Sequence, residues 1–144
     1  VRRRAQITAA YTDVLKQYPG VRMHEGPEPV RHAHHLYTFF ADPADGIPRD
    51  RLVSRLDALG VQMQLRYFPM HLLAEWRARG HTAGECPVAE RLWFEQQVNL
   101  PCHPAMTDRQ VGQVVSRLDT VLGQEARDRP IASVTTPTAE GWNR

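Results

Sequence analysis

The stretch that decides the fold runs from Val61 to His71 and reads VQMQLRYFPMH. Apolar or amphipathic side chains alternate with polar ones through its first seven residues. This period of two predicts a β-strand over 61–67 with one buried face and one wet face. Pro69 ends the strand, because proline cannot donate a hydrogen bond to a sheet ladder. The strand end and the turn after it then carry Tyr67 and His71, where rigid elements frequently present functional side chains.

The composition is typical of a single, water-soluble globular domain. The chain has 144 residues, of which 42% are hydrophobic and 24% charged, and its formal net charge is +2. This length is sufficient for one core. No apolar run approaches the roughly 20 residues that span a bilayer, and no apolar signal segment follows the basic start. We therefore predict a cytoplasmic protein that makes no membrane contact.

Arginine supplies nearly all of the positive charge, because Lys16 is the single lysine among 18 basic residues. Arginine clusters bind phosphate or nucleic acid. Here the arginines are dispersed among acidic residues, apart from the short cluster at residues 2–4. This distribution favours a coding preference for arginine, and we expect no nucleic-acid partner.

Seven histidines and two cysteines raise the question of a metal site. His32, His34 and His35 lie close together in the sequence, and Cys102 adjoins His103. None of these groups has the spacing of a zinc site, in which a close cysteine pair precedes a histidine pair. We predict free thiols and no metal.

The first half of the chain alternates between helical and extended patterns. One apolar stripe over residues 2–18 predicts an amphipathic helix, and a short strand is expected at 21–25. The aromatic-rich segment 34–41 predicts a central strand. Pro48 then opens a second helix in the position where proline fits best, and Gly60 ends it.

The second half is predominantly helical. Short helices are predicted at 72–79 and from Pro87 to about residue 97, followed by a brief extended segment at 98–101. Thr107 supplies an N-cap for the clearest amphipathic helix, which extends to residue 122. Residues 124–144 lose periodicity and are rich in polar side chains and proline, so we predict a flexible tail.

Six short motifs follow one another along residues 2–122. They are Arg3-Arg4 with Ala9-Ala10-Tyr11 and Leu15; His34-His35-Leu36-Tyr37; Arg49-Asp50 with Leu56 and Leu59-Gly60-Val61; Tyr67-Phe68-Pro69-Met70-His71; Cys86-Pro87-Val88-Ala89-Glu90; and Leu100-Pro101-Cys102-His103-Pro104 with Thr107. In this order the motifs resemble the C-terminal small domain of the DegT/DnrJ/EryC1/StrS aminotransferases. These are pyridoxal-phosphate enzymes, many of which aminate keto sugars on nucleotide carriers.

The resemblance, together with the element order, implies an α+β fold. We expect a small, mainly antiparallel sheet of three or four strands, with helices on one side. The first and last helices should lie against this sheet. The small domain is assigned to residues 1–123, and the tail to 124–144.

Transamination requires a lysine that forms a Schiff base with pyridoxal phosphate. The family carries this lysine, and the phosphate-binding cradle, in a larger N-terminal domain that the sequence lacks. Lys16 lies on the first predicted helix and is interpreted as a solvent-facing residue. We therefore expect that this chain holds no catalytic residue and binds no cofactor by itself. The start at Val1 suggests a fragment of a longer enzyme or the product of a truncated gene.

The resemblance also implies a site. In the family, the small domain closes the mouth of the active site and its turn faces the substrate, so Tyr67 and His71 are assigned as substrate-binding residues. Their expected ligand is the phosphate or sugar of a nucleotide-linked keto sugar, or a keto-cyclitol, with glutamate or glutamine as amino donor. Purely structural roles stay open for both residues: Tyr67 as a half-buried tyrosine on an edge strand, and His71 as a helix-capping or surface histidine. His34 and His35 are neighbours on a predicted central strand, so one of the two is expected to point inward, and a hydrogen-bonded core histidine is the favoured interpretation.

The expected partners are the missing large domain and a second subunit in a homodimer. An alternative is a truncated, non-catalytic paralogue that acts as a protein-binding module. A small nucleic-acid-binding domain is a second alternative, and it predicts affinity that falls as salt concentration rises.

Overall fold

The computed structural model describes residues 1–23 and 31–128. Its helices and strands alternate along the chain as follows: α1 (Arg2–Leu15), β1 (Val21–Met23), β2 (Tyr37–Ala41), α2 (Arg49–Ala58), α3 (Ala74–Arg77), α4 (Pro87–Arg91), β3 (Gln97–Leu100) and α5 (Asp108–Arg127). Short 3-10 turns stand at Pro43–Asp45 and Met70–Leu72, and a π-helical turn at Leu92–Gln96 continues α4. The predicted α+β class is confirmed.

The sheet has three antiparallel strands in the order β1-β2-β3. The predicted central strand is confirmed, because Phe39 of β2 stands opposite Met23 on one side and Val98 on the other. Alternate residues of β2 are buried, which places Tyr37, Phe39 and Ala41 on one face of the sheet. The extended segment expected at 98–101 is β3, an edge strand of the described sheet.

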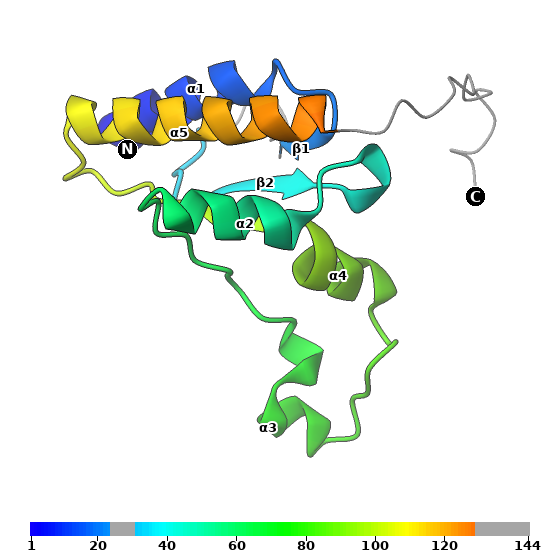
Figure 1. Cartoon of the computed structure of the whole chain (residues 1–144). Coiled ribbons are helices and arrows are strands. Elements are labelled where there is room, and N and C mark those ends of the chain that lie inside the picture. Colours follow the sequence, from blue (N-terminus) through cyan, green and yellow to red (C-terminus); the bar gives the residue numbers. More distant parts are fainter. Residues whose placement is uncertain (24–30, 129–144) are drawn as a thin grey trace.

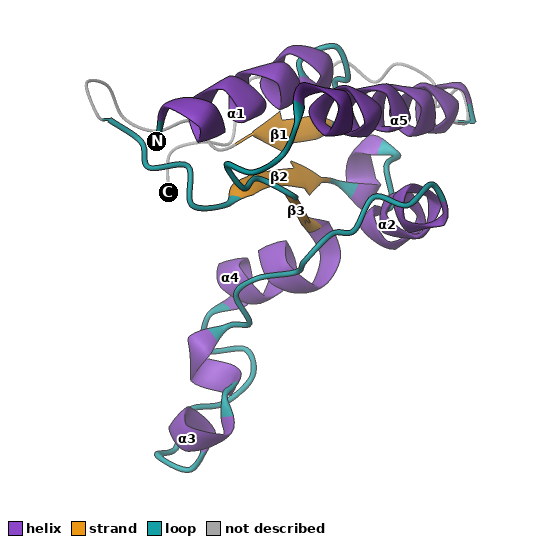
Figure 2. Cartoon of the chain, turned by 90° about the vertical axis from the view of Figure 1, so that its left-hand side faces the viewer, coloured by secondary structure: helices purple, strands orange, loops and turns teal. Residues whose placement is uncertain are grey.

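Three helices cover the face that carries Phe39. Figures 1 and 2 show α1 and α5 side by side above the sheet, with α2 beside α5. Tyr11, Phe39, Leu52 and Leu118 meet in this layer and are completely buried. Tyr11 also donates a hydrogen bond to the carbonyl of Pro101 at 2.9 Å, so the core includes a satisfied hydroxyl. We call this unit of sheet, α1, α2 and α5 the body.

The prediction of a β-strand over 61–67 is wrong. This segment is extended and runs beside β3, but it forms no regular ladder. The side chain of Asn99 replaces the ladder, because its Oδ1 accepts the backbone N–H of Arg66 at 3.0 Å. Gln97 likewise donates through its side-chain amide to the carbonyl of Arg66. Val61 is buried, whereas Leu65 is exposed, so the alternation marks an extended segment whose far end leaves the core.

The helix ends illustrate local sequence signals. Gly60 adopts φ of +77° after α2, and Val61 N–H bonds back to the carbonyl of Leu56 at 2.9 Å, as in a C-terminal glycine cap. Thr107 and Gln110 form the predicted N-terminal cap of α5 as a reciprocal capping box. The helix then continues to Arg127, beyond the expected end, so residues 124–127 are helical. The rest of the predicted tail, 129–144, lies outside the described residues.

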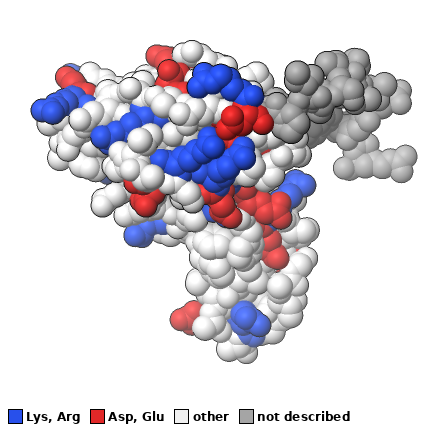
Figure 3. Space-filling view, viewed as in Figure 1, with Lys and Arg blue, Asp and Glu red and all other residues white. Residues whose placement is uncertain are grey.

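Residues 67–94 leave the body and form a projection that we call the arm. Figures 1 and 2 show α3 far from the sheet, with α4 on the path back. The arm exposes large apolar side chains: Tyr67, Phe68, Met70, Leu73, Val88 and Phe94. Charged side chains gather over the body in Figure 3, whereas the visible face of the arm is mostly uncharged. In the part of the chain described here, no helix combines the length and apolarity that a membrane span requires.

Candidate functional site

The two predicted site residues stand on the arm in different surroundings. Tyr67 is 64% exposed, and its hydroxyl lies 3.2 Å from Nε2 of His35. His71 belongs to the turn at Met70–Leu72, and 10% of its side chain is exposed. Its Nε2 lies 2.8 Å from Oε1 of Glu90. The structure therefore pairs each predicted residue with a partner that the sequence did not indicate.

Glu90 gathers several hydrogen bonds in the interior of the arm. Its side chain is 17% exposed, and besides His71 it accepts the backbone N–H of Gly84 at 2.8 Å and of Cys86 at 3.4 Å. The hydrogen bond with His71 is the largest cause that lowers the pKa of the Glu90 carboxyl below its usual value; burial opposes it, and the two backbone amides assist. The pair thus consists of an ionised carboxylate and an imidazole that donates from Nε2.

Tyr67 contacts a histidine that lines a cavity beside β2. His35 lies just before β2, and it lines a cavity of about 400 Å³ whose floor includes Leu36 and Phe40. The remaining lining residues are polar: His32, Thr38 and Gln97. The hydroxyl of Tyr67 reaches this cavity only through its contact with His35. No pattern in the sequence joins Tyr67 to His35, because 31 residues separate them.

The sequence predicts that one of His34 and His35 points inward from the strand. His35 is exposed, and His34 is the more buried of the two. His34 is half-buried and has a positive φ of 50°; its Nδ1 lies 3.4 Å from the hydroxyl of Thr8 and 3.2 Å from Nδ1 of His32. Burial lowers the pKa of the His34 imidazole, and the neighbouring His32 adds to this effect.

Aromatic side chains hold the base of the arm. The rings of Phe68 and Trp93 meet edge to face, with their centroids 4.7 Å apart. Phe94 packs edge to face on Trp93, with a centroid distance of 4.8 Å. The buried side chain of Arg49, at the start of α2, donates to the backbone carbonyl of Phe94. Trp76 lies near the tip and is half-buried against His81. Both tryptophans are therefore arm residues outside the core of the body.

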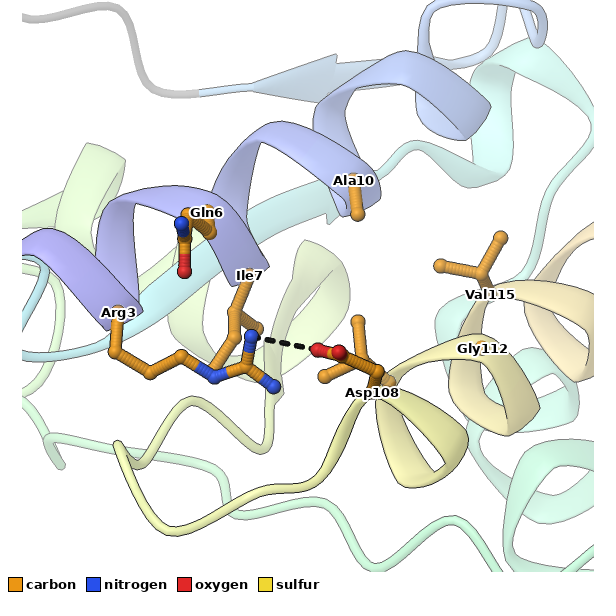
Figure 4. A pocket seen from close by; sticks show the side chains of 8 residues that line it. Arg3, Gln6, Ile7, Ala10, Asp108, Gly112 and Val115 are labelled. Atoms are coloured by element: carbon orange, nitrogen blue, oxygen red, sulfur yellow. Dashed lines mark ion pairs between the residues drawn. The ribbon is translucent and has the colours of Figure 1, made fainter.

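A second hollow follows the seam between α1 and α5. It is an open groove of about 690 Å³, with Ile7, Ala10 and Val115 on its walls and the ion pair of Arg3 and Asp108 at one end, 2.7 Å apart (Figure 4). This single charged pair is neutralised internally, so the groove offers little polar chemistry. Among residues 1–23 and 31–128, no group of histidine, cysteine and acidic side chains could hold a metal ion.

Lys16 does not fit the role of a cofactor lysine. It caps the C-terminal end of α1, where its side chain is exposed to solvent. It is not among the residues that line the cavity at His35 or the groove between α1 and α5. A Schiff-base lysine needs an enclosed site beside the phosphate and ring of the cofactor, and the described residues around Lys16 do not form one.

Comparison with solved structures identifies the class of fold. Aminotransferase TlmJ from Streptoalloteichus hindustanus matches 88% of this chain with a TM-score of 0.73 and 28% identity, and the match covers 32% of that enzyme. S. venezuelae DesV, solved in complex with a ketimine intermediate, matches 83% of the chain with a TM-score of 0.71 and 26% identity, over 31% of its own length. The fold is thus that of one part of an aminotransferase.

Sequence comparison supplies the family. The model of the DegT/DnrJ/EryC1/StrS aminotransferase family matches residues 1–119, so the chain belongs to this family. GDP-perosamine synthase of Caulobacter vibrioides is 30% identical over 93 residues, which cover 64% of this chain and 24% of that protein. The chain spans about a third or less of the relatives that it matches.

Proposed function

We propose that this chain acts as the small domain of a pyridoxal-phosphate aminotransferase. The substrate is a nucleotide-linked keto sugar or a keto-cyclitol, glutamate or glutamine supplies the amino group, and the enzyme works in the cytoplasm. The observation that carries this proposal is the family match over residues 1–119. The likeness to GDP-perosamine synthase supports a sugar-nucleotide substrate.

In this proposal the cofactor belongs to a large domain outside the chain. Such a domain supplies the lysine and the phosphate cradle, which the neighbourhood of Lys16 does not provide. The apolar side chains exposed on the arm support a role in contact with that domain or with a second subunit in a homodimer, because exposed apolar patches commonly mark interaction surfaces. The isolated chain is then inactive.

Tyr67 and His71 are the proposed substrate contacts. The exposed hydroxyl of Tyr67 can donate to a phosphate or accept from a sugar hydroxyl. The side chain of His71 is only 10% exposed and its Nε2 faces Glu90, so it can present only one edge of its ring to a ligand. The alternative role for each is structural: a bond to His35 for Tyr67, and closure of the arm for His71.

The test begins with the DNA upstream of the codon for Val1. A continuing reading frame that encodes a lysine-bearing cofactor domain supports the proposal, and the complete product can then be purified. We expect it to show the absorption band of bound pyridoxal phosphate and to aminate a nucleotide-linked keto sugar with glutamate. A complete product that binds pyridoxal phosphate but aminates no nucleotide-linked sugar or cyclitol would contradict the substrate class.

Substitutions in that product test the two residues. Replacing His71 by Asn should lower kcat/KM by about 10- to 100-fold, the cost of losing one hydrogen bond to a charged or polar partner. Replacing Tyr67 by Phe should have a smaller effect in the same direction. The matched control is His81→Asn, because His81 is also an arm histidine paired with a glutamate but lies at the exposed tip. Equal losses from H71N and H81N would refute a substrate contact at His71.

A second candidate function is a non-catalytic protein-binding module. The exposed apolar side chains of the arm favour it, since they suit a protein surface as well as a missing domain. It predicts that a stop codon and a ribosome-binding site lie directly upstream of Val1. It also predicts that the 144-residue chain is monodisperse and co-purifies with a full-length aminotransferase. Loss of this association in a Met70→Ser, Val88→Ser variant would place the contact on the arm.

A further inference from the structure

The carboxylate of Glu90 is the acceptor around which the arm closes. It lies on α4, yet it receives hydrogen bonds from His71, which precedes α3, and from Gly84 in the loop between α3 and α4. The Gly84 N–H reaches both carboxylate oxygens, at 2.8 and 3.1 Å. One side chain therefore joins three segments that are separated by up to 19 residues in sequence.

This arrangement determines which nitrogen of His71 carries a proton. An ionised carboxylate can only accept hydrogen bonds, so the nitrogen that faces it must donate. Nε2 of His71 is that nitrogen, at 2.8 Å from Oε1 of Glu90. Nδ1 makes no hydrogen bond to any residue in the described parts of the chain, and it is not sealed from solvent.

We propose that Glu90 is a positioning residue, which fixes the imidazole of His71 and leaves Nδ1 as the nitrogen that meets a ligand. The inference rests on the proposed function, in which His71 contacts the substrate. In the neutral ring, Nδ1 is an acceptor, so it matches a donor such as a sugar hydroxyl. A phosphate group only accepts hydrogen bonds, and the neutral ring held in this way would not recognise it.

The arm contains a second histidine–glutamate pair, which provides a control for substitutions of Glu90. His81 and Glu85 form a second imidazole–carboxylate pair at the tip, with Nδ1 of His81 at 3.0 Å from Oε1 of Glu85. The side chains of this pair are 35% and 43% exposed, compared with 10% and 17% for His71 and Glu90. Glu85→Gln therefore removes the same kind of charge from the same arm without touching His71.

The test is an NMR measurement of the histidine rings in the 144-residue chain, with no ligand added. His71→Asn identifies the signals of His71. We expect the Nε2 proton of His71 to be visible and slow to exchange with water in the natural chain and in E85Q. In E90A its exchange should accelerate by about tenfold or more, as expected for loss of a charge-assisted hydrogen bond.

Glu90→Gln keeps the shape of the side chain and tests the charge. A glutamine amide can either donate or accept, so E90Q should show His71 as a mixture of Nε2–H and Nδ1–H forms. This variant remains informative even if E90A loses the order of the arm, which the far-ultraviolet circular dichroism and the other ring signals report. The proposal is overturned if His71 of the natural chain carries its proton on Nδ1. It is also overturned if both Glu90 variants leave the ring signals unchanged.

These outcomes separate the inference from the function on which it rests. The ring measurement contains no substrate and no cofactor, so its failure refutes positioning by Glu90 alone. The transamination test in the complete product reports on the substrate class, so its failure refutes the proposed function and removes the substrate from the inference, whereas the fixing of the His71 ring by Glu90 is still decided by the ring measurement.

Discussion

The body and the arm are held together by different interactions, although one continuous chain forms both. The body is closed by apolar burial: Phe39 on the central strand and Leu118 on α5 have no exposed surface. The arm is closed by the hydrogen bonds of Glu90 and by an aromatic group at its base, and it leaves Tyr67 and Met70 in solvent. Apolar burial is the dominant favourable contribution to folding, so the body should be the more stable unit.

A few polar contacts connect the two regions. Arg49 reaches the carbonyl of Phe94 at one end of the arm, and the hydroxyl of Tyr67 contacts His35 at the other. Directly before the arm, the side chains of Gln97 and Asn99 hold Arg66. Regions with little buried apolar surface open locally at a lower free energy than the core. We infer that the arm can change its arrangement while the body stays folded, which suits a segment proposed to meet a substrate or a partner.

The largest expected difference between the regions comes from two matched phenylalanines. Phe39→Ala should lower the free energy of unfolding by about 3–5 kcal/mol, because it opens a cavity in a close-packed core. Phe94 is 44% exposed and lies on the arm, so Phe94→Ala should remove about 1–2 kcal/mol, or about half of the burial energy of the ring, from the closure of the arm and change the global free energy of unfolding little. Urea denaturation followed by far-ultraviolet circular dichroism measures both. Equal losses would show that the arm and the body unfold as one unit.

The next effect concerns the charge cluster between α2 and α5. Glu125 is fully buried, and Arg51 and Arg55 approach its two oxygens, Arg55 at 2.8 Å. Both arginines are partly exposed and can turn toward water if the carboxylate is lost. We therefore expect Glu125→Gln to destabilise the chain by about 1–3 kcal/mol, between the values for exposed and buried ion pairs.

The comparison variant for Glu125 is Glu85→Gln, at the exposed tip of the arm. The side chains of His81 and Glu85 are 35% and 43% exposed, so their ion pair contributes little and the same urea measurement should give an unchanged midpoint. A shift for E85Q as large as that for E125Q would contradict the assignment of the global stability to the body.

Acid should open the arm at a higher pH than it unfolds the body. The pKa values of Glu90 and Glu85 lie below the ordinary 4.5 in the folded chain, chiefly because His71 and His81 bond to them. The stabilisation from these carboxylates is therefore fully present above pH 4.5 and is lost as the pH falls through their lower folded values. Trp76 and Trp93 both lie on the arm, so tryptophan fluorescence reports this step.

The acid measurement needs one background variant and one comparison. Trp142→Phe removes the tryptophan outside the described residues, and circular dichroism at 222 nm follows the helices of the body. We expect the fluorescence change to precede the loss of helix, and Glu90→Gln to remove most of its pH dependence. Coincident transitions in both signals would indicate that the arm has no separate acid step.

The sequence predicted the body better than the arm, for a physical reason. Periodicity and caps are local signals, and they correctly indicated the central strand, the glycine cap at Gly60 and the N-cap at Thr107. The segment 61–67 misled, because its alternation describes which side chains face the core and does not specify what satisfies the backbone. That role falls to Asn99, a residue 33 positions away from Arg66.

The candidate site shows the same limit. The family resemblance indicated Tyr67 and His71, and the structure places both residues on the arm. The partners His35 and Glu90 could not be found from spacing, because each pairing depends on how the arm folds back. The Pro-x-Ala-Glu motif contained Glu90 from the start, but its sequence pattern indicated a helix start and gave no sign of the imidazole that it meets.

The smallest expected effect concerns two glycines that both adopt a positive φ. Gly60 ends α2 with φ of +77°, and Gly80 follows α3 with φ of +99°; an added Cβ would meet only the end of Arg117 at 3.7 Å in the first case and open space in the second. Each Gly→Ala change therefore costs mainly backbone strain, about 1–2 kcal/mol. G60A should lower the global stability by that amount in urea. G80A should leave the circular dichroism midpoint in place and shift only the tryptophan transition, because a cost confined to a locally opening segment does not reach the global equilibrium. If G80A lowers both midpoints as G60A does, the arm unfolds only together with the body, and the local freedom inferred for it does not exist.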